Sequence, residues 1–179
     1  MGASTVTSTG ETVLNGNLGL YAGTSITGFP PGTVVNGAIH DTDGVAQQAQ
    51  ADALTAYTSL KNATGAVNLS GDTLGNGGVT LPVPTLGPGV YSFSSSAQLT
   101  GALTLNGPGE YIFQIYSTLT TASASSIILE NGASASDVFW QVGSSATLGT
   151  TTSFYGSILA EDSISLDTGR IFCRAEPWL

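Results

Sequence analysis

This sequence has very little charge. Only 8% of its 179 residues are Asp, Glu, Lys or Arg, whereas about a quarter is usual for a soluble domain. Three residues are basic and 12 are acidic, which gives a formal net charge of −9. Proteins that bind nucleic acid or anionic lipid need clusters of Lys and Arg to meet the phosphates. We therefore expect neither nucleic acid nor a membrane as a partner.

Cysteine, histidine and long apolar runs are also scarce. A single cysteine, Cys173, cannot form an intramolecular disulfide, and with the single histidine, His40, it cannot assemble a Cys/His metal site. No stretch approaches the 18 or so apolar residues of a membrane-spanning helix. Met1 to Ser4 carry no basic segment or apolar core of a signal peptide. We expect no cofactor, no metal, and a secreted protein that lacks its signal peptide in this sequence.

Hydroxyl groups supply the missing polarity, because the chain contains 24 Thr and 21 Ser. The second half repeats an aromatic strand, a Thr/Ser-rich strand and a small aliphatic strand. Tyr111–Ile115 leads into Ser117–Ser123, and Val138–Val142 leads into Ser145–Ser153. Repetition at about 20 to 30 residues predicts a solenoid, in which each coil buries its apolar side against its neighbours.

One segment has the pattern of a helix. Residues 45–61 contain no Gly or Pro, and they predict a helix over about 43–61 with Asp41 or Asp43 as its N-cap. Its apolar stripe is expected at Val45, Ala49, Ala53, Leu54, Tyr57 and Leu60. Four strands are apolar on both sides and should lie beneath this helix; they cover residues 90–94, 111–115, 138–142 and 157–161.

The spacing between matching positions of these strands is irregular. We expect Phe93 to match Phe113, Ile112 to match Phe139, and Trp140 to match Leu159. Residues 72–89, which are rich in Gly and Pro, are interpreted as a connection into the next strand.

Other chemistry can be weighed against simpler interpretations. Asp41-Thr42-Asp43-Gly44 resembles the start of a calcium loop but lacks the later ligands, so helix capping is favoured. Glu161 and Asp162 are adjacent on one strand and point to opposite faces, which argues against a glycosidase pair with Asp167 nearby. Phe139-Trp140 is interpreted as buried beneath the helix rather than as a sugar platform.

The arrangement of the threonines is the feature that points to a binding surface. Alternation on the Thr-rich strands predicts an outward array; inward positions are Val6, Ile26, Leu99, Leu119, Leu148 and Leu166. The candidate binding residues are Thr5, Thr7, Thr9, Ser25, Thr27, Gln98, Thr100, Thr118, Thr120, Thr147, Gly149, Thr151 and Ser165. Thr also has high β propensity, which alone would explain its use on strands. The lack of charge on this face favours a binding surface, because exposed strands usually carry Lys or Glu.

Several blocks resemble one known family. They are Thr24–Gly32, Leu86–Phe93, Tyr111–Ile115, Asp137–Val142 through Thr147–Thr150, and Phe154–Ala160 with Ser163–Gly169. Together they resemble the microbial ice-binding proteins that have a discontinuous β-solenoid and one flanking helix. The resemblance covers residues 4–169, and the tail 170–179 departs from it. It implies a mainly β, right-handed solenoid of triangular cross-section with one long helix along one face, and a flat Thr/Ser/Ala/Gly ice-binding face without cofactor.

We therefore expect residues 1–179 to form one ice-binding domain that is not an enzyme. The predicted partner is the surface of an ice crystal, to which a monomer adsorbs. The alternative is an extracellular adhesion or polysaccharide-binding solenoid.

Overall fold

The computed structural model describes residues 2, 4–8, 11–71, 73–77, 82–167 and 172–174. The chain folds as two compact units, Met1–Thr58 and Ser59–Leu179. That the two units act as one ice-binding domain stays a prediction. Almost every element is a short parallel strand, as alternating apolar and hydroxyl residues between glycine turns predict.

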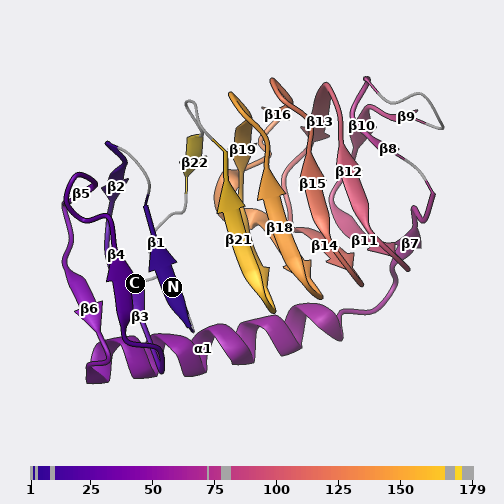
Figure 1. The fold of residues 1–179 in the computed structure, drawn as a ribbon. Coiled ribbons are helices and arrows are strands. Elements are labelled where there is room, and N and C mark those ends of the chain that lie inside the picture. The colour runs from indigo at the N-terminus through magenta and orange to yellow at the C-terminus, as the bar shows by residue number, and fades with distance from the viewer. Residues whose placement is uncertain are drawn as a thin grey trace. The chain divides into compact units, whose positions relative to one another are not determined.

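The first unit contains two stacked coils of three strands each (Figure 1). The first coil comprises β1 (Thr5–Thr7), β2 (Val13–Asn15) and β3 (Leu18–Leu20), and the second β4 (Ser25–Thr27), β5 (Thr33–Val35) and β6 (Ile39–Asp41). Each strand pairs in parallel with its equivalent, β1 with β4, β2 with β5 and β3 with β6. Val6 and Ile26, two of the expected inward positions, are the central residues of β1 and β4.

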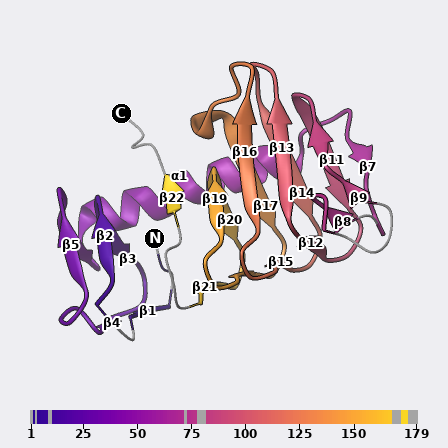
Figure 2. The same cartoon turned by 90° about the horizontal axis from the view of Figure 1, so that it is seen from above.

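The second unit is a three-sided solenoid whose sheets enclose a common interior (Figure 2). One sheet contains β7 (Val67–Asn68), β11 (Gly89–Phe93), β14 (Tyr111–Ile115), β17 (Val138–Val142) and β20 (Ser157–Ala160). A second contains β8 (Thr73–Leu74), β9 (Pro82–Val83), β12 (Ala97–Leu99), β15 (Leu119–Thr121), β18 (Ser145–Leu148) and β21 (Ser163–Leu166). The third contains β10 (Thr85–Leu86), β13 (Ala102–Asn106), β16 (Ser126–Glu130), β19 (Ser153–Tyr155) and β22 (Phe172–Arg174). The predicted mainly β solenoid with one helix is confirmed.

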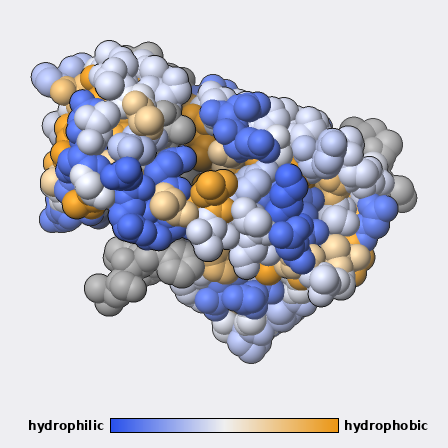
Figure 3. Space-filling view, turned by 90° about the horizontal axis from the view of Figure 1, so that it is seen from below, coloured by the Kyte–Doolittle hydropathy of each residue, from blue (hydrophilic) through white to orange (hydrophobic). Residues whose placement is uncertain are grey.

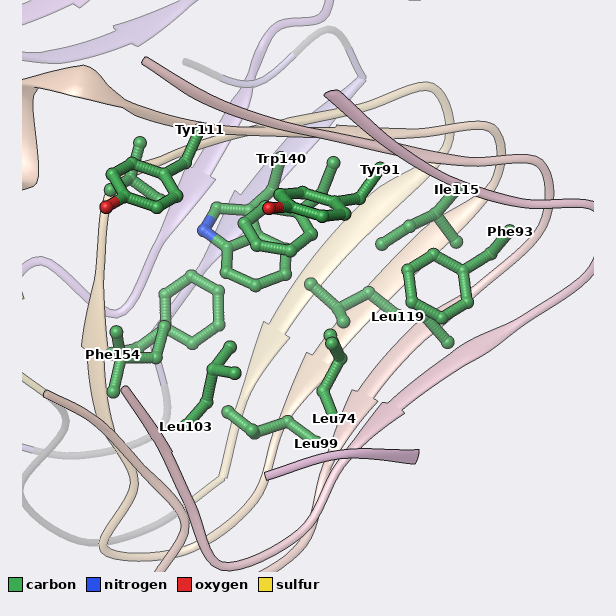
Figure 4. Packing of buried hydrophobic residues seen from close by; sticks show 14 of the residues in the cluster. Leu74, Tyr91, Phe93, Leu99, Leu103, Tyr111, Ile115, Leu119, Trp140 and Phe154 are labelled. Atoms are coloured by element: carbon green, nitrogen blue, oxygen red, sulfur yellow. The ribbon is translucent and has the colours of Figure 1, made fainter. Parts of the chain in front are cut away.

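Aromatic rings stacked from coil to coil form the centre of the second unit (Figure 4). The ring centroids of Tyr91 and Phe113 are 5.6 Å apart, and those of Phe113 and Trp140 are 3.9 Å apart with nearly parallel planes. Phe154 closes the stack against Trp140, whose indole Nε1 donates to the carbonyl of Tyr155. Trp140 is fully buried, as expected, but it lies in the interior of the solenoid rather than beneath the helix, and Phe139 is half-buried.

The register corrects two of the three expected matches. Ile112 pairs with Phe139 as expected, but Phe113 pairs with Tyr91 and Trp140 pairs with Ile158. Thr73–Leu74, Pro82–Val83 and Thr85–Leu86 are the short strands β8, β9 and β10, where a plain connection over 72–89 was expected. The register and these short strands were both missed because the lengths of the corners set which parallel strands pair, and the residue pattern within a strand does not reveal those lengths. At Gly156, for example, one residue with φ +107 makes a whole corner, and an added Cβ would lie 2.6 Å from the Val138 carbonyl oxygen.

Helix α1 spans Gly44–Lys61, within one residue of the predicted range. Asp43 is its N-cap, because its Oδ1 accepts the Ala46 N–H at 2.8 Å, and its Oδ2 lies 2.7 Å from His40 Nδ1. The buried side differs from the predicted stripe: Ala46 is buried, whereas Val45 and Leu54 are 56% and 65% exposed. Positions 46, 49, 53, 57 and 60 share one helical face, and residues 45 and 54 lie beside it. Among the described helices, none combines the length and hydropathy needed to cross a membrane.

The cap predicts a specific acid sensitivity. Hydrogen bonds from the Ala46 N–H and from His40 lower the pKa of Asp43 below its usual value of 3.8. The ionised Asp43 carboxylate should stabilise the fold fully well above pH 3.8, and this stabilisation should be lost as the pH falls through the lower pKa that Asp43 has in the folded state. In circular dichroism at 222 nm from pH 6 to pH 2, Asp43→Asn should lose less helical signal on acidification than the wild type. Asn caps helices comparably and does not titrate, so identical acid profiles would contradict this role.

Gln114 attaches the end of α1 to the first sheet of the second unit. Its Nε2 donates to the carbonyls of Leu60 and Ala63, each at 2.8 Å, and lies 3.3 Å from that of Lys61. The carbonyls of Leu60 and Lys61 belong to the last turn of α1, where a helix lacks intrahelical partners. The Leu60 carbonyl also accepts the Ala63 N–H at 3.2 Å. The expectation that the helix packs on the strands apolar on both sides is confirmed for this last turn.

Removing this amide should cost stability. Gln114→Ala removes the side-chain donor from two half-buried carbonyls, of which that of Leu60 keeps only the longer bond from the Ala63 N–H at 3.2 Å. We expect it to lower the free energy of unfolding by about 1 to 3 kcal/mol. Urea denaturation followed by circular dichroism measures the change. Gln98→Ala is the matched control, because Gln98 is exposed and its amide bonds only the hydroxyl of Thr100. Equal effects of the two substitutions would argue against a role for Gln114 at the helix end.

Candidate functional site: a hydroxyl-bearing sheet

The candidate site is the outer face of the sheet formed by β8, β9, β12, β15, β18 and β21, here called the hydroxyl face (Figure 1). Its middle ladder joins Gln98, Thr120, Thr147 and Ser165, which are in register on four neighbouring strands. The residues on either side of them, such as Leu99, Leu119 and Leu148, point inward and are fully buried. The alternation thus places one complete row of predicted residues side by side.

Two further ladders flank the middle one. Ser145 pairs with Ser163, and Thr118 donates to Ser96 Oγ at 2.7 Å, so these four residues form a row of hydroxyls. Ser163 Oγ likewise donates to Ser145 Oγ at 2.9 Å. On the other side, one residue beyond the paired Leu99, Thr121, Leu148 and Leu166, lie Thr100, Ala122, Gly149 and Asp167. Gly149 is buried. A larger residue would not fit there, since an added Cβ would lie 2.5 Å from the Thr121 carbonyl oxygen.

The spacing of these groups is regular. Neighbouring strands of a sheet are about 4.8 Å apart, and outward residues on one strand about 6.6 Å apart. No Lys, Arg, Asp or Glu occurs in the six strands of the face. Thr has few χ1 rotamers, so an array of Thr loses little entropy when it is held in place. The result is a two-dimensional array made mostly of hydroxyl and methyl groups, with Asp167, one residue beyond β21, as the charged member of its three ladders.

In the first unit, the paired strands β1 and β4 carry a smaller array of outward hydroxyl groups. Thr5 is in register with Ser25 and Thr7 with Thr27, and all four side chains are exposed while Val6 and Ile26 point inward. Thr27 Oγ1 donates to Thr7 Oγ1 at 3.2 Å. Thr9 lies outside the described residues. Thr151 is exposed in a corner turn, with φ 58, rather than on a strand.

Sequence reasoning missed part of the array. Ser96, Ser145 and Ser163 were not among the candidates, although each lies two residues before a predicted one, as a period of two requires. Leu166 was expected to be buried and keeps the register of Leu148, but it is 55% exposed. On the last described strand of this sheet, Leu166 has a neighbouring strand on one side only.

The other two faces of the second unit are less suited to a flat partner. On the third sheet, Ile128 is 40% exposed, and a cleft of about 730 Å³ between Ala133–Ala135 and Tyr155 makes the surface concave. The outward side of the first sheet carries Gln114, bonded to the helix, and Gln141, which is buried. On the side of the molecule seen in Figure 3, hydrophilic and hydrophobic residues are interspersed in small patches.

The carboxylates do not converge on a reactive centre. No group of three or more His, Cys, Asp or Glu that could hold a metal occurs within the described ranges. Asp43 and His40 bond each other at the start of α1, in agreement with helix capping rather than a calcium loop. Asp162 accepts a hydrogen bond from Ser144, and Glu161 and Asp167 are exposed. The fold and this face define a β-solenoid protein with rows of hydroxyl-bearing side chains in register on the outer side of one sheet.

Comparison with known proteins gives the family. Residues 1–175 match the model of the ice-binding-like family, and the chain belongs to this family. The resemblance to microbial ice-binding proteins is thereby confirmed. So is the interpretation that the chain is not an enzyme, because the family and its members are ice-binding proteins.

Individual relatives agree with this assignment. An ice-binding protein of Nostoc sp. (strain HG1) is 55% identical over 173 residues, which are 94% of this chain and 61% of that protein. The chain thus spans less than two thirds of that relative. The crystal structure of an ice-binding protein from an Antarctic biological consortium has a TM-score of 0.85 and 42% identity, covering 97% of this chain and 78% of that one. One from the Antarctic ascomycete Antarctomyces psychrotrophicus has a TM-score of 0.83 and 37% identity, covering 94% and 90%.

Proposed function

We propose that this protein adsorbs to ice through the hydroxyl face, halts crystal growth below the melting point and inhibits recrystallisation. The observation that carries the proposal is the middle ladder with the row of hydroxyls beside it, which are in register across β12, β15, β18 and β21, strands that contain no charged residue. Thr5, Thr7, Ser25 and Thr27 are proposed to contribute in the same way from the first unit. Family membership supports ice as the partner.

The mechanism is the sum of many weak contacts. Hydroxyls hydrogen-bond to water of the crystal surface, and the methyl groups between them order the remaining water. Each hydrogen bond contributes about 1 kcal/mol net, so about ten simultaneous contacts supply roughly 10 kcal/mol. A rigid face is needed, because contacts to a crystal form together only when their spacing is already fixed. An uncharged face is also needed, because a charged side chain holds its own hydration shell at the surface.

The site of action and the assembly state are part of the proposal. Ice grows in bulk water, so a secreted monomer would meet its partner directly, and no cofactor enters the mechanism. A surface-adhesion or polysaccharide-binding solenoid remains the alternative. It would bind chitin or glucan in pull-down assays and leave ice growth unchanged.

Nanolitre osmometry on the purified protein tests the proposal. A single ice crystal held below its melting point should become faceted and keep its size over a temperature gap. In parallel, polycrystalline ice annealed a few degrees below zero should keep small grains. A round crystal that grows freely, with coarsening grains, would reject ice binding for this chain.

A further inference from the structure

On the inner side of the sheet that carries the hydroxyl face, one threonine interrupts a row of leucines. The last residues of β12, β15, β18 and β21, which are in register, are Leu99, Thr121, Leu148 and Leu166. Thr121 thus occupies a place where the neighbouring strands have leucine, and it is only 7% exposed. A buried hydroxyl is unfavourable unless it is hydrogen-bonded, so its partners define what it does.

Those partners lie on the next coil. Gly149 N–H donates to Thr121 Oγ1 at 2.9 Å, Thr121 and Thr152 bond through their hydroxyls at 3.0 Å, and Thr152 Oγ1 donates to the Gly149 carbonyl at 2.7 Å. Since Thr152 donates its proton to Gly149, Thr121 must donate to Thr152. The three bonds form a closed ring that begins and ends on the peptide groups of Gly149.

This ring replaces a backbone bond that is present at the equivalent places. Ala122 N–H donates to the Leu99 carbonyl, and Asp167 N–H donates to the Leu148 carbonyl, each at 2.9 Å. Between β15 and β18 the corresponding N–H, that of Gly149, is bonded by the Thr121 side chain. The two coils approach closely here, because a Cβ on Gly149 would lie 2.5 Å from the Thr121 carbonyl oxygen.

We propose that Thr121 and Thr152 are positioning residues for ice binding: their buried hydroxyls fix the corner at Gly149 and thereby hold the outward ladders of β15 and β18 in register. Outside the same corner, Thr150 Oγ1 donates to Ser123 Oγ at 2.9 Å, so the hydroxyls at the edge of the face are paired across the same two coils. This inference rests on the proposed function, since it assigns to two residues the rigidity that the face requires.

Thr121→Val tests it, because Val keeps the shape of Thr, removes the hydroxyl and suits a position flanked by leucines. We expect the chain to stay folded in the cold with a lower melting temperature, because the buried Gly149 N–H loses its acceptor and the Thr152 hydroxyl its donor. We also expect a thermal hysteresis that is reduced about threefold or more, since a loosened supporting shell impairs a preorganised site. Thr121→Ser, which keeps the hydroxyl, should retain most of the activity. Asn106→Ala removes a side-chain hydrogen bond of 2.8 Å to Asn131 at a different corner and should leave hysteresis unchanged.

The dependence of hysteresis on protein concentration separates positioning from stability. A variant that only unfolds more easily behaves as a diluted sample, and more protein restores its hysteresis. A misplaced ladder lowers hysteresis at every concentration. Full activity of Thr121→Val, or activity restored by concentration, would overturn the inference. The proposed function fails separately, if substitutions on the outer surface of the hydroxyl face leave hysteresis intact.

Discussion

Thr147→Tyr is expected to abolish thermal hysteresis while the chain stays folded. Thr147 lies in the middle ladder between Thr120 and Ser165 and points outward from β18. A tyrosine ring there would hold ice away from the surrounding groups, and losing about four contacts of about 1 kcal/mol each corresponds to a large drop in the occupancy of the ice surface. Tyrosine is itself favourable in strands, so the fold should tolerate it. Nanolitre osmometry measures the hysteresis, and circular dichroism checks the fold.

The matched variants locate the face. Thr118→Tyr, one ladder away, should have the same effect. Thr104→Tyr places the same ring on β13 of the third sheet, where Thr104 is in register with Thr85 and Ile128, and it should leave hysteresis unchanged. Wild-type activity in both Thr118→Tyr and Thr147→Tyr would show that the wrong face was chosen. Loss of activity in Thr104→Tyr alone would move the site to the third sheet.

The largest loss of stability is expected from Trp140→Ala. The indole is fully buried, stacks on Phe113 at 3.9 Å and contacts Phe154 across the interior. Truncating such a side chain creates a cavity and costs about 3 to 5 kcal/mol of unfolding free energy. Because Trp140 belongs to the second unit, the loss should appear in the transition of that unit when urea denaturation is followed by circular dichroism.

Tyr116→Ala provides the comparison, since Tyr116 is also aromatic, lies one residue after β14 and is 78% exposed. It should change stability by no more than about 0.5 kcal/mol. Trp140→Phe keeps a ring in the stack and should fall between the two. A loss below about 1 kcal/mol for Trp140→Ala would mean that the aromatic stack does not hold the coils together, contrary to the close ring contacts.

Much of the fold was predictable because it depends on local pattern. A period of two identifies strands such as Ser25–Thr27 and Leu119–Thr121 from their own residues, and the absence of Gly and Pro marks the helix. The prediction of strand pairing was wrong where the register depends on the contacts between neighbouring coils. Trp140 was matched to Leu159 instead of Ile158 because the one-residue corner at Gly156 cannot be recognised from strand pattern alone.

The candidate site divides in the same way. The members of the middle ladder were all among the predicted residues, since Gln98, Thr120 and Thr147 each alternate with a buried leucine and Ser165 precedes Leu166 in the same pattern. Ser96 and Ser145 were missed, because each ends a run of serines at a turn, and which serine of the run faces outward depends on its neighbours on other coils. Thr121 was not recognised as an inward residue for a related reason: its role depends on Gly149 and Thr152, which are about 30 residues further along the chain.

The corners of the second unit differ in length while the hydroxyl face keeps its register. Between the third sheet and the first, the chain uses residues 107–110, then 131–137, then only Gly156. Gln98, Thr120 and Thr147 nevertheless remain aligned. Length at this edge is thus uncoupled from the geometry of the opposite sheet, and residues 131–134 offer a place to insert a peptide tag or a fluorescent label. For the same reason, insertions and deletions at these corners could accumulate during evolution without changing the register of the hydroxyl face.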